Sequence, residues 1–302
     1  MLFDITKANI EMLPNDLFSQ KQVSVSVLRL DKIHPVVSGN KLFKLHYFLE
    51  EAIHSTHKTL LTFGGAYSNH LVATAFACAS LNIKSIGIVR GEESQQLSPS
   101  LQECMAYGMQ LKFISRHDFT AKDDAGFIRS LQDQFGECII IPEGGYHPSG
   151  AKGAALIMEL TGDKYYSHIC TAMGTATTLA GILSAAKPQQ TIIGIQVLKG
   201  ITDTNERIQH LTGLHDIPTN LQILPDYHFG GYAKKTDHLI QFMNQCWQQY
   251  RLPLDFVYTA KMLYGITDCI QNNHFEKGAE ILCLHTGGLQ GNKSLSLNTL
   301  MF

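Results

Sequence analysis

The sequence has no excess of charge of either sign and no long apolar segment. Its 302 residues include 24 Lys and Arg and 26 Asp and Glu, for a formal net charge of −2. This balance lacks the basic surface expected of a protein that binds nucleic acid or an anionic membrane. No apolar run approaches the roughly 18 residues that a membrane-spanning helix needs. Residues 1–20 have neither a basic segment nor an apolar stretch after it, so we expect no signal peptide.

Motifs for metal binding and for redox chemistry are also lacking. The cysteines form no CxxC pair and the histidines no HExxH motif, so we predict no metal site. Cysteines in odd number within apolar stretches are typical of buried free thiols in a reducing cytoplasm. The seven are Cys78, Cys104, Cys138, Cys170, Cys246, Cys269 and Cys283. Ser68 does not lie in a GxSxG motif, so a hydrolase triad is not indicated.

What is present is an alternation of apolar strand-like and helix-like segments, with 44% hydrophobic residues and enough length for two domains. Apolar runs predict strands at 23–30, 59–63, 86–89, 111–114, 138–141, 168–172, 191–197 and 281–285. Helical spacing predicts helices at 41–53, 69–81, 101–107, 119–135, 178–186, 237–250 and 262–271. The period-two pattern of 23–30 predicts one exposed strand face. The alternation favours an α/β fold with parallel sheets covered on both faces.

Four predicted strands end in glycine-bearing loops, at Gly64-Gly65, Gly144-Gly145, Gly174 and Gly287-Gly288. In open α/β sheets ligands bind beyond the carboxyl ends of the strands, and glycine lets the backbone approach them closely. The 174–178 loop joins a strand to a helix and offers backbone N–H groups and three hydroxyls, which suits a phosphate. It matches neither the nucleotide P-loop nor GxGxxG. A capped helix after a tight turn is the alternative interpretation.

Lys41 follows Gly39 and Asn40 at the start of a predicted helix. A lysine at such a loop-to-helix junction, together with a phosphate site, suggests pyridoxal phosphate. This cofactor needs a lysine for its Schiff base and donors for its phosphate. It also needs partners for its phenolic oxygen and its ring nitrogen, and candidates for these are present as well.

Six short motifs carry a resemblance to a known family. They are Ser38-Gly39-Asn40-Lys41, the segment 63–70 (FGGAYSNH), Pro142-Glu143-Gly144-Gly145, the segment 174–181, Val257-Tyr258-Thr259-Ala260-Lys261 and His285-Thr286-Gly287-Gly288. In this order, over most of the chain, they resemble the 1-aminocyclopropane-1-carboxylate deaminase / D-cysteine desulfhydrase family of pyridoxal-phosphate enzymes.

The resemblance implies the fold of the tryptophan synthase β subunit, fold type II of these enzymes. It has two open, twisted parallel-sheet domains with pyridoxal 5'-phosphate in the cleft between them. The larger domain would comprise residues 1–44 plus 152–302, and the smaller inserted domain residues 45–151. The resemblance further implies a homodimer that acts on a small amino acid. We expect a cytoplasmic protein with no nucleic-acid or membrane partner.

Residue roles follow from the same resemblance. Lys41 matches the Schiff-base lysine, which also moves the α-proton of the substrate. Asn69 matches the partner of the phenolic oxygen, and Ser68 a contact to the substrate carboxylate. Tyr258 and Tyr232 match two active-site tyrosines, and Thr286 and Thr259 would lie near the ring nitrogen. The phosphate cradle would consist of Gly174, Thr175, Ala176, Thr177 and Thr178.

Thr259 and Thr286 also bear on the substrate. Family members that open a cyclopropane ring resemble one another in having Glu and Leu at these positions, whereas the desulfhydrase branch has Thr at both. A carboxylate keeps the ring nitrogen protonated and the electron sink strong, as cleavage of a carbon–carbon bond requires. A hydroxyl sustains a weaker sink, which suffices to eliminate a thiolate.

We therefore expect β-elimination on D-cysteine or a similar β-substituted amino acid, giving pyruvate, ammonia and sulfide. The first alternative is 1-aminocyclopropane-1-carboxylate deaminase activity, which gives 2-oxobutyrate and ammonia. The second is a pyridoxal-phosphate-binding protein without catalytic activity.

Several of these residues also fit purely structural roles. Ser68 and Asn69 fit as helix N-caps, Tyr258 and Tyr232 as packed aromatics, and Thr286 as a turn cap. His70 and His285 fit structural roles better than catalytic ones, and Lys261 fits a surface or ion-pair lysine. Three residues depart from the family pattern: Phe43 replaces an arginine, and Thr177 and Ala233 replace glycines.

Overall fold

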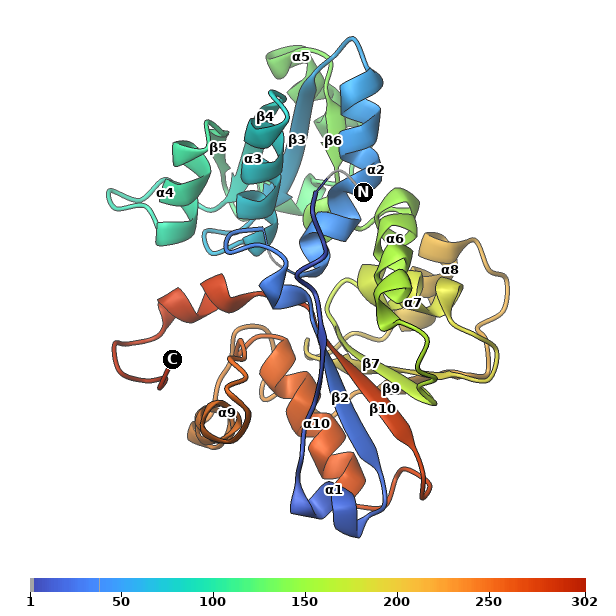
Figure 1. Cartoon of the computed structure of the whole chain (residues 1–302). Coiled ribbons are helices and arrows are strands. Elements are labelled where there is room, and N and C mark those ends of the chain that lie inside the picture. The colour runs from blue at the N-terminus through green and yellow to red at the C-terminus, as the bar shows by residue number, and fades with distance from the viewer. Residues whose placement is uncertain (1–2, 38) are drawn as a thin grey trace.

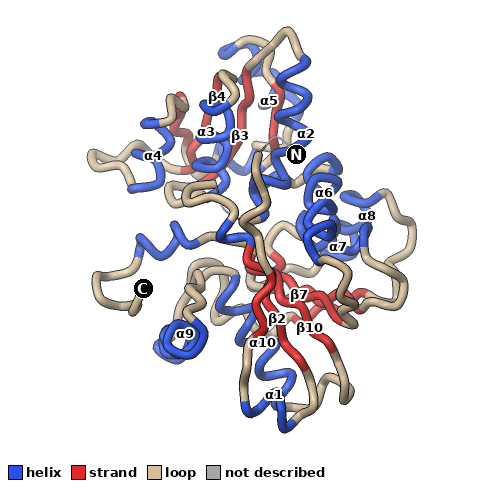
Figure 2. The backbone as a smooth tube through the Cα atoms, in the orientation of Figure 1, coloured by secondary structure: helices blue, strands red, loops and turns tan. Residues whose placement is uncertain are grey.

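The computed structural model describes residues 3–37 and 39–302, so Ser38 of the first motif lies outside the described residues. Figure 1 shows two sheets, one in the upper and one in the lower half of the view, each with helices packed against it. Figure 2 shows their strands as two separate groups joined by helices and loops. This architecture confirms the predicted α/β class with two parallel-sheet units.

The lower sheet has six strands in the order β1-β2-β10-β7-β8-β9. All neighbours in it are parallel except β1, which runs antiparallel to β2 at one edge. Its strands are β1 (Ile10–Met12), β2 (Ser24–Arg29), β7 (His168–Met173), β8 (Thr191–Gln196), β9 (Leu221–Leu224) and β10 (Glu280–His285).

Helices cover this sheet on both faces, because successive side chains of a strand point to opposite sides. Leu282 and Leu284 of β10 join a core with α6 (Pro148–Ala155), α7 (Thr177–Ala185) and α8 (Thr204–Thr212). Ile281 and Cys283 join a second core with α1 (Asp16–Gln20), α9 (Asp237–Tyr250) and α10 (Thr259–Gln271). The chain thus buries its central strands on both faces.

The upper sheet has four parallel strands in the order β5-β4-β3-β6. They are β3 (Thr59–Gly64), β4 (Lys84–Arg90), β5 (Gln110–Ile114) and β6 (Ile139–Ile141). The helices are α3 (Asn69–Ser80) and α4 (Pro99–Ala106) on one face and α5 (Ala125–Phe135) on the other. Helix α2 (Asn40–His54) packs in the core that contains side chains from both sheets. The proposed domain boundaries at 44/45 and 151/152 remain a prediction.

Short 3₁₀-helical segments complete the element order. They are η1 (Leu30–Lys32), η2 (Asp118–Ala121), η3 (Glu143–Gly145), η4 (Leu156–Thr161) and η5 (Leu289–Ser294). The predicted helix at 119–135 is confirmed over 125–135 as α5, but its beginning is wrong, because 118–121 form the separate segment η2. The division falls at Asp124, whose side chain caps α5 by accepting a hydrogen bond from the Phe127 N–H (2.9 Å).

The predicted exposed face of the strand at 23–30 is also wrong. Strand β2 lies between β1 and β10 and is buried along most of its length, and its polar Ser26 is buried with it. The alternation of Ser and Val therefore reflects tolerance for small hydroxyl side chains inside the sheet rather than exposure. Sequence reasoning also missed five short elements, which have little periodicity: β1, α1, α6, α8 and β9.

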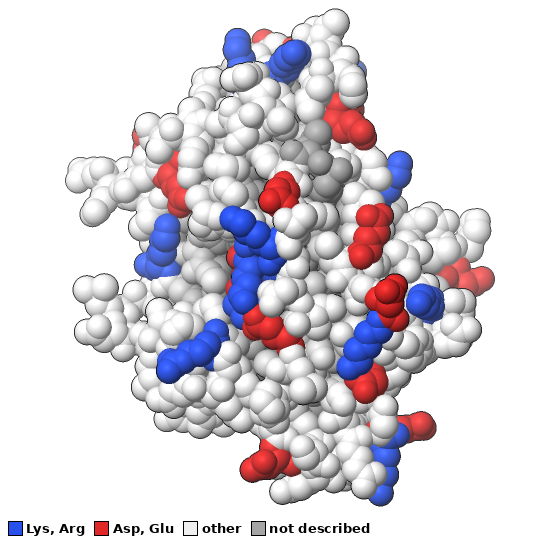
Figure 3. Space-filling view, viewed as in Figure 1, with Lys and Arg blue, Asp and Glu red and all other residues white. Residues whose placement is uncertain are grey.

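All seven cysteines are buried and free, as predicted. Within residues 3–37 and 39–302, the helices are too short or too polar to cross a membrane. Figure 3 shows Lys and Arg interspersed with Asp and Glu over the visible face, in keeping with the balanced net charge.

Candidate active site

The start of helix α2 is fixed against the end of strand β10. Gly39 has a φ of +76°, and a Cβ atom there would lie 1.9 Å from the carbonyl oxygen of Thr286. The Asn40 N–H donates to the same oxygen (3.2 Å). Only glycine allows this contact, because a side chain would meet both the left-handed backbone and the carbonyl. The contact places Lys41 at the carboxyl end of the lower sheet.

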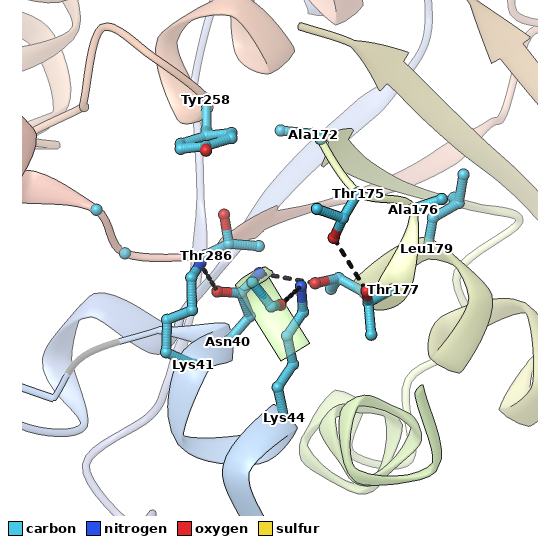
Figure 4. A pocket seen from close by; sticks show the side chains of 15 residues that line it. Asn40, Lys41, Lys44, Ala172, Thr175, Ala176, Thr177, Leu179, Tyr258 and Thr286 are labelled. Atoms are coloured by element: carbon cyan, nitrogen blue, oxygen red, sulfur yellow. Dashed lines mark hydrogen bonds between the residues drawn. The ribbon is translucent and has the colours of Figure 1, made fainter. Parts of the chain in front are cut away.

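Lys41 lies in a pocket that is built from five segments of the chain (Figure 4). The lining comes from the start of α2, from η3, from the end of β7 through the start of α7, from Tyr258 just before α10, and from the loop after β10. The lining residues are Asn40, Lys41, Lys44, Gly144, Ala172, Gly174, Thr175, Ala176, Thr177, Thr178, Leu179, Tyr258, Thr286, Gly287 and Gly288. The structure thus brings Lys41, the 174–178 loop, Tyr258 and Thr286 together.

Asn40 connects Lys41 to the 174–178 loop. Lys41 Nζ donates to Asn40 Oδ1 (2.8 Å), and Asn40 Nδ2 donates to Thr178 Oγ1 (2.7 Å). Lys41 Nζ also lies 5.8 Å from the centre of the Tyr258 ring. Burial lowers the pKa of Lys41 to about 8, although the negative charge of Asp255 acts in the opposite direction. About a tenth of the lysine is therefore the free amine at pH 7, and about half at pH 8.

This pKa predicts how Lys41 would capture the aldehyde of pyridoxal phosphate, the cofactor expected from the sequence. The free amine is the nucleophile, so the capture rate should rise about tenfold per pH unit below pH 8 and level off above it. Asp255→Asn removes a charge that favours the ammonium and should move the midpoint to lower pH. Stopped-flow absorbance across a pH series measures both midpoints. A midpoint near the usual lysine pKa would contradict the assignment.

The 174–178 loop has the form of an anion cradle. Ala176 adopts the left-handed conformation (φ +68°), and α7 begins at the next residue without a side-chain cap from any described residue. Its first backbone N–H groups therefore need a partner, and a helix N-terminus favours an anion. The hydroxyls of Thr175 and Thr177 hydrogen-bond each other (2.9 Å). The threonine at 177, where the family commonly has glycine, thus keeps a hydroxyl in the cradle.

Lys44 is a pocket residue that sequence reasoning missed. It is buried, and its Nζ donates to the carbonyl oxygen of Gly144 (3.1 Å). Burial, and then the charge of Lys41, lower the pKa of Lys44 well below its usual value. A phosphate bound beside it would restore its charge. The sequence could have indicated this position, because Lys44 lies three residues after Lys41 in a predicted helix, and residues with this spacing lie on the same helix face.

Ser68 and Asn69 lie at the edge of the pocket rather than in its lining. Ser68 caps α3 by accepting from the Leu71 N–H (3.2 Å). Asn69 Nδ2 donates to the Gly288 carbonyl (3.4 Å), and its buried Oδ1 has no partner among the described residues. Nδ2 carries two N–H groups, and the second has no acceptor among the described residues. Asn69 therefore has hydrogen-bonding capacity left for a ligand.

Asp255 is a second residue that sequence reasoning missed. It is completely buried, and its carboxylate accepts from the backbone N–H groups of Val257, Tyr258 and Thr259. It also accepts from Thr259 Oγ1 (2.6 Å). The carboxylate thus caps α10 and holds Tyr258 at its start. The Thr259 side chain is buried against Asp255 and outside the pocket lining, so Thr286 is the threonine that faces the pocket.

The two tyrosines differ in exposure. Tyr258 lines the pocket, and burial together with the nearby Tyr232 raises the pKa of its phenol well above the usual value. Tyr232 is 52% exposed and lies outside the lining. The expectation for Lys261 is wrong, because this lysine is completely buried. Its Nζ donates to the carbonyls of His228 (2.9 Å) and Gly231 (2.8 Å), in the loop that carries Tyr232.

The two buried histidines make structural contacts. His70 Nε2 lies 3.0 Å from Thr62 Oγ1, and burial lowers the pKa of His70 to about 3. The two ring nitrogens of His285 lie 2.6 Å from the Pro253 carbonyl and 3.2 Å from Asp31 Oδ1. Both rings connect segments that are apart in the sequence.

The residues present fit pyridoxal phosphate. An uncapped helix N-terminus suits the phosphate, a lysine amine lies within the pocket, and Asn69 has a second N–H group left to donate to an oxygen of the ligand. Together with the two parallel sheets, this site defines a pyridoxal-phosphate enzyme of fold type II.

Comparison with known proteins supports this class. The model of the pyridoxal-phosphate dependent enzyme family matches residues 11–287, and the chain belongs to that family.

Individual relatives are similar over most of their length. A Pyrococcus furiosus protein provisionally named 1-aminocyclopropane-1-carboxylate deaminase is 30% identical and covers 93% of this chain and 89% of its own. The D-cysteine desulfhydrase of Klebsiella pneumoniae is 25% identical over 87% of this chain and 86% of its own. The crystal structure of a homologue of 1-aminocyclopropane-1-carboxylate deaminase is 26% identical, with a TM-score of 0.81 over 96% of this chain and 92% of that one.

Proposed function

We propose that this chain is a lyase that removes the β-substituent of D-cysteine or a similar amino acid, giving pyruvate, ammonia and sulfide. The observation that carries the proposal is the pair of threonines. Thr286 presents a hydroxyl to the pocket, and Thr259 directs its hydroxyl to Asp255. The described pocket lining therefore contains no carboxylate that would keep a ring nitrogen protonated. A weak electron sink suits loss of a thiolate.

The pocket residues would divide the binding of the cofactor among them. Bound pyridoxal phosphate supplies an aldehyde that captures amines and a ring that accepts electrons from the substrate Cα. The N–H groups of the 174–178 loop and the Lys44 ammonium would hold its phosphate. Asn69 would bind its phenolic oxygen and Thr286 its ring nitrogen. Gly287 and Gly288 leave the backbone close to the ligand.

Lys41 and Tyr258 would handle the protons. With a pKa near 8, the Lys41 amine can take a proton from the substrate Cα at moderate pH and return one later. Tyr258 keeps its hydroxyl proton, because its pKa is raised, and can donate a hydrogen bond to the departing thiolate. Ser68, at the N-terminus of α3, would bind the substrate carboxylate, and Tyr232 would complete the site from the exposed side.

A substrate panel tests the reaction. Purified holoenzyme is given D-cysteine, L-cysteine, other β-substituted amino acids and 1-aminocyclopropane-1-carboxylate. Sulfide and pyruvate should form in equal amounts from D-cysteine, and pyruvate with an equal amount of the released β-substituent from an analogue. Production of 2-oxobutyrate alone would instead establish ring opening. The matched control is the same panel with Lys41→Ala.

Ring opening remains the second candidate, because the Pyrococcus relative bears that name and an Arabidopsis thaliana relative, 28% identical, is named for both activities. A silent pyridoxal-phosphate protein is the third candidate. Its cofactor absorbance would stay constant with every amino acid of the panel.

We also propose that the chain forms a homodimer in the cytoplasm, with domains 1–44 plus 152–302 and 45–151. The family resemblance supports all three parts of this proposal. Light scattering on the purified holoenzyme tests the oligomer, since a monomer mass would contradict it.

A further inference from the structure

We infer that Lys261 is a positioning residue, which ties the loop of residues 228–233 to helix α10 and thereby sets Tyr232 beside Tyr258. The inference rests on the proposed function only for the catalytic importance of the two tyrosines. The link between helix and loop rests on geometry.

The ammonium of Lys261 joins two turns of the 228–233 loop. The side chain is 0% exposed, and Nζ donates to the carbonyls of His228 (2.9 Å) and Gly231 (2.8 Å). The same carbonyls accept the N–H groups of Gly231 (2.9 Å) and Lys234 (3.2 Å). A buried ammonium is costly unless it is compensated. The two carbonyls supply that compensation, and the loop must keep its form to do so.

The loop is strained at Phe229 and Ala233, because both carry a side chain at positive φ, whereas glycine adopts positive φ without strain. Four of its residues have positive φ: Phe229 (+50°), Gly230 (+91°), Gly231 (+117°) and Ala233 (+52°). Side chains disfavour this region, and strain of this kind persists where surrounding structure holds the backbone. Ala233 stands where the family pattern has a glycine, so this chain lacks the residue that would relieve the strain. The hydrogen bonds from Lys261 stabilise the loop in its place.

Helix α10 contacts the 228–233 loop and also Tyr227, the residue just before it. Lys261 lies in the first turn of α10, and Tyr258 is the N-cap residue of the same helix, so both side chains are attached to one end of α10. Further along, Gly265 leaves room for the Tyr227 ring, because a Cβ there would lie 2.9 Å from that ring. The Tyr227 hydroxyl donates to Asp268 Oδ2 (2.8 Å). The position of α10 therefore determines where the loop places Tyr232.

Hydrogen exchange of the holoenzyme tests the link without any activity. In Lys261→Met, the Gly231 and Lys234 amides should exchange about tenfold faster or more, because their acceptor carbonyls lose the ammonium. Lys261→Arg keeps the charge and should restore part of the protection. Lys187→Met, an exposed control, should leave it unchanged. Unchanged exchange in Lys261→Met overturns the inference. If that variant does not fold, Lys261→Gln serves in its place.

Kinetics then test whether Lys261 acts through Tyr232. Lys261→Met should lower kcat about tenfold when Tyr232 is present and less than about threefold in a Tyr232→Phe background, because coupled residues are not additive. Equal losses in both backgrounds overturn the positioning role. If Tyr232→Phe itself keeps full activity, the proposed role of Tyr232 in the reaction is wrong. The hydrogen-exchange result still decides whether Lys261 ties the 228–233 loop to α10.

Discussion

Lys41→Ala should abolish covalent trapping of the cofactor. Borohydride treatment of the parent holoenzyme should fix the cofactor on the peptide that carries Lys41, and mass spectrometry should find no such adduct in the variant. Turnover should fall by about 10²–10⁴-fold or more, because the residue also moves the substrate proton. The physical reason is its place: Lys41 Nζ lies in the pocket, and burial lowers its pKa to about 8.

Lys44→Met is the matched control for that experiment. The two lysines lie in the same turn of α2 and both line the pocket. Methionine matches the apolar part of the Lys44 side chain but removes its ammonium group. The adduct on Lys41 should remain, while cofactor affinity falls about tenfold to a hundredfold through loss of a charge-assisted hydrogen bond. An adduct found on Lys44 or Lys261 in Lys41→Ala would place the covalent site elsewhere.

Much of the fold could be predicted because its strands carry clear signals. The apolar segments at 168–172 and 281–285 correspond to β7 and β10, which are buried on both faces. The glycine loops after these strands meet at one sheet edge, as expected for parallel strands. The place of the pocket could therefore be predicted from the apolar strand segments, the glycine loops after them, and the rule that ligands bind beyond the carboxyl ends of parallel strands.

The roles of the buried charged residues could not be predicted, because they depend on contacts between segments that are distant in the sequence. Asp255 looks like an ordinary loop carboxylate in the sequence, yet it is completely buried and receives four hydrogen bonds from 257–259. Lys261 looks like a surface lysine, yet its partners lie 30 and 33 residues away. Such roles have no periodic signature, because tertiary packing alone decides whether a charged side chain is exposed or satisfied inside.

The contact between Thr259 and Asp255 bears on a double substitution that should change the substrate preference. Thr259→Glu combined with Thr286→Leu should move products from pyruvate toward 2-oxobutyrate. The longer Glu side chain reaches past the place of the Thr259 hydroxyl and brings a carboxylate toward the pocket. Asp255 Oδ2 lies only 2.6 Å from Thr259 Oγ1, so the new carboxylate lies close to an existing one. Two neighbouring carboxylates repel each other when both are ionised. A protonated ring nitrogen of the cofactor would offset this repulsion with its positive charge.

Thr259→Gln with Thr286→Leu is the control that separates charge from shape. Glutamine matches the size of glutamate but cannot protonate or deprotonate the ring nitrogen. If charge controls the electron sink, the Glu variant should gain 2-oxobutyrate formation from 1-aminocyclopropane-1-carboxylate by about tenfold or more over the Gln variant, a difference of about 1.4 kcal/mol in barrier. Product ratios that change equally in both variants would show that pocket shape selects the substrate. Unchanged ratios in both would remove the basis for deriving the substrate from these two threonines.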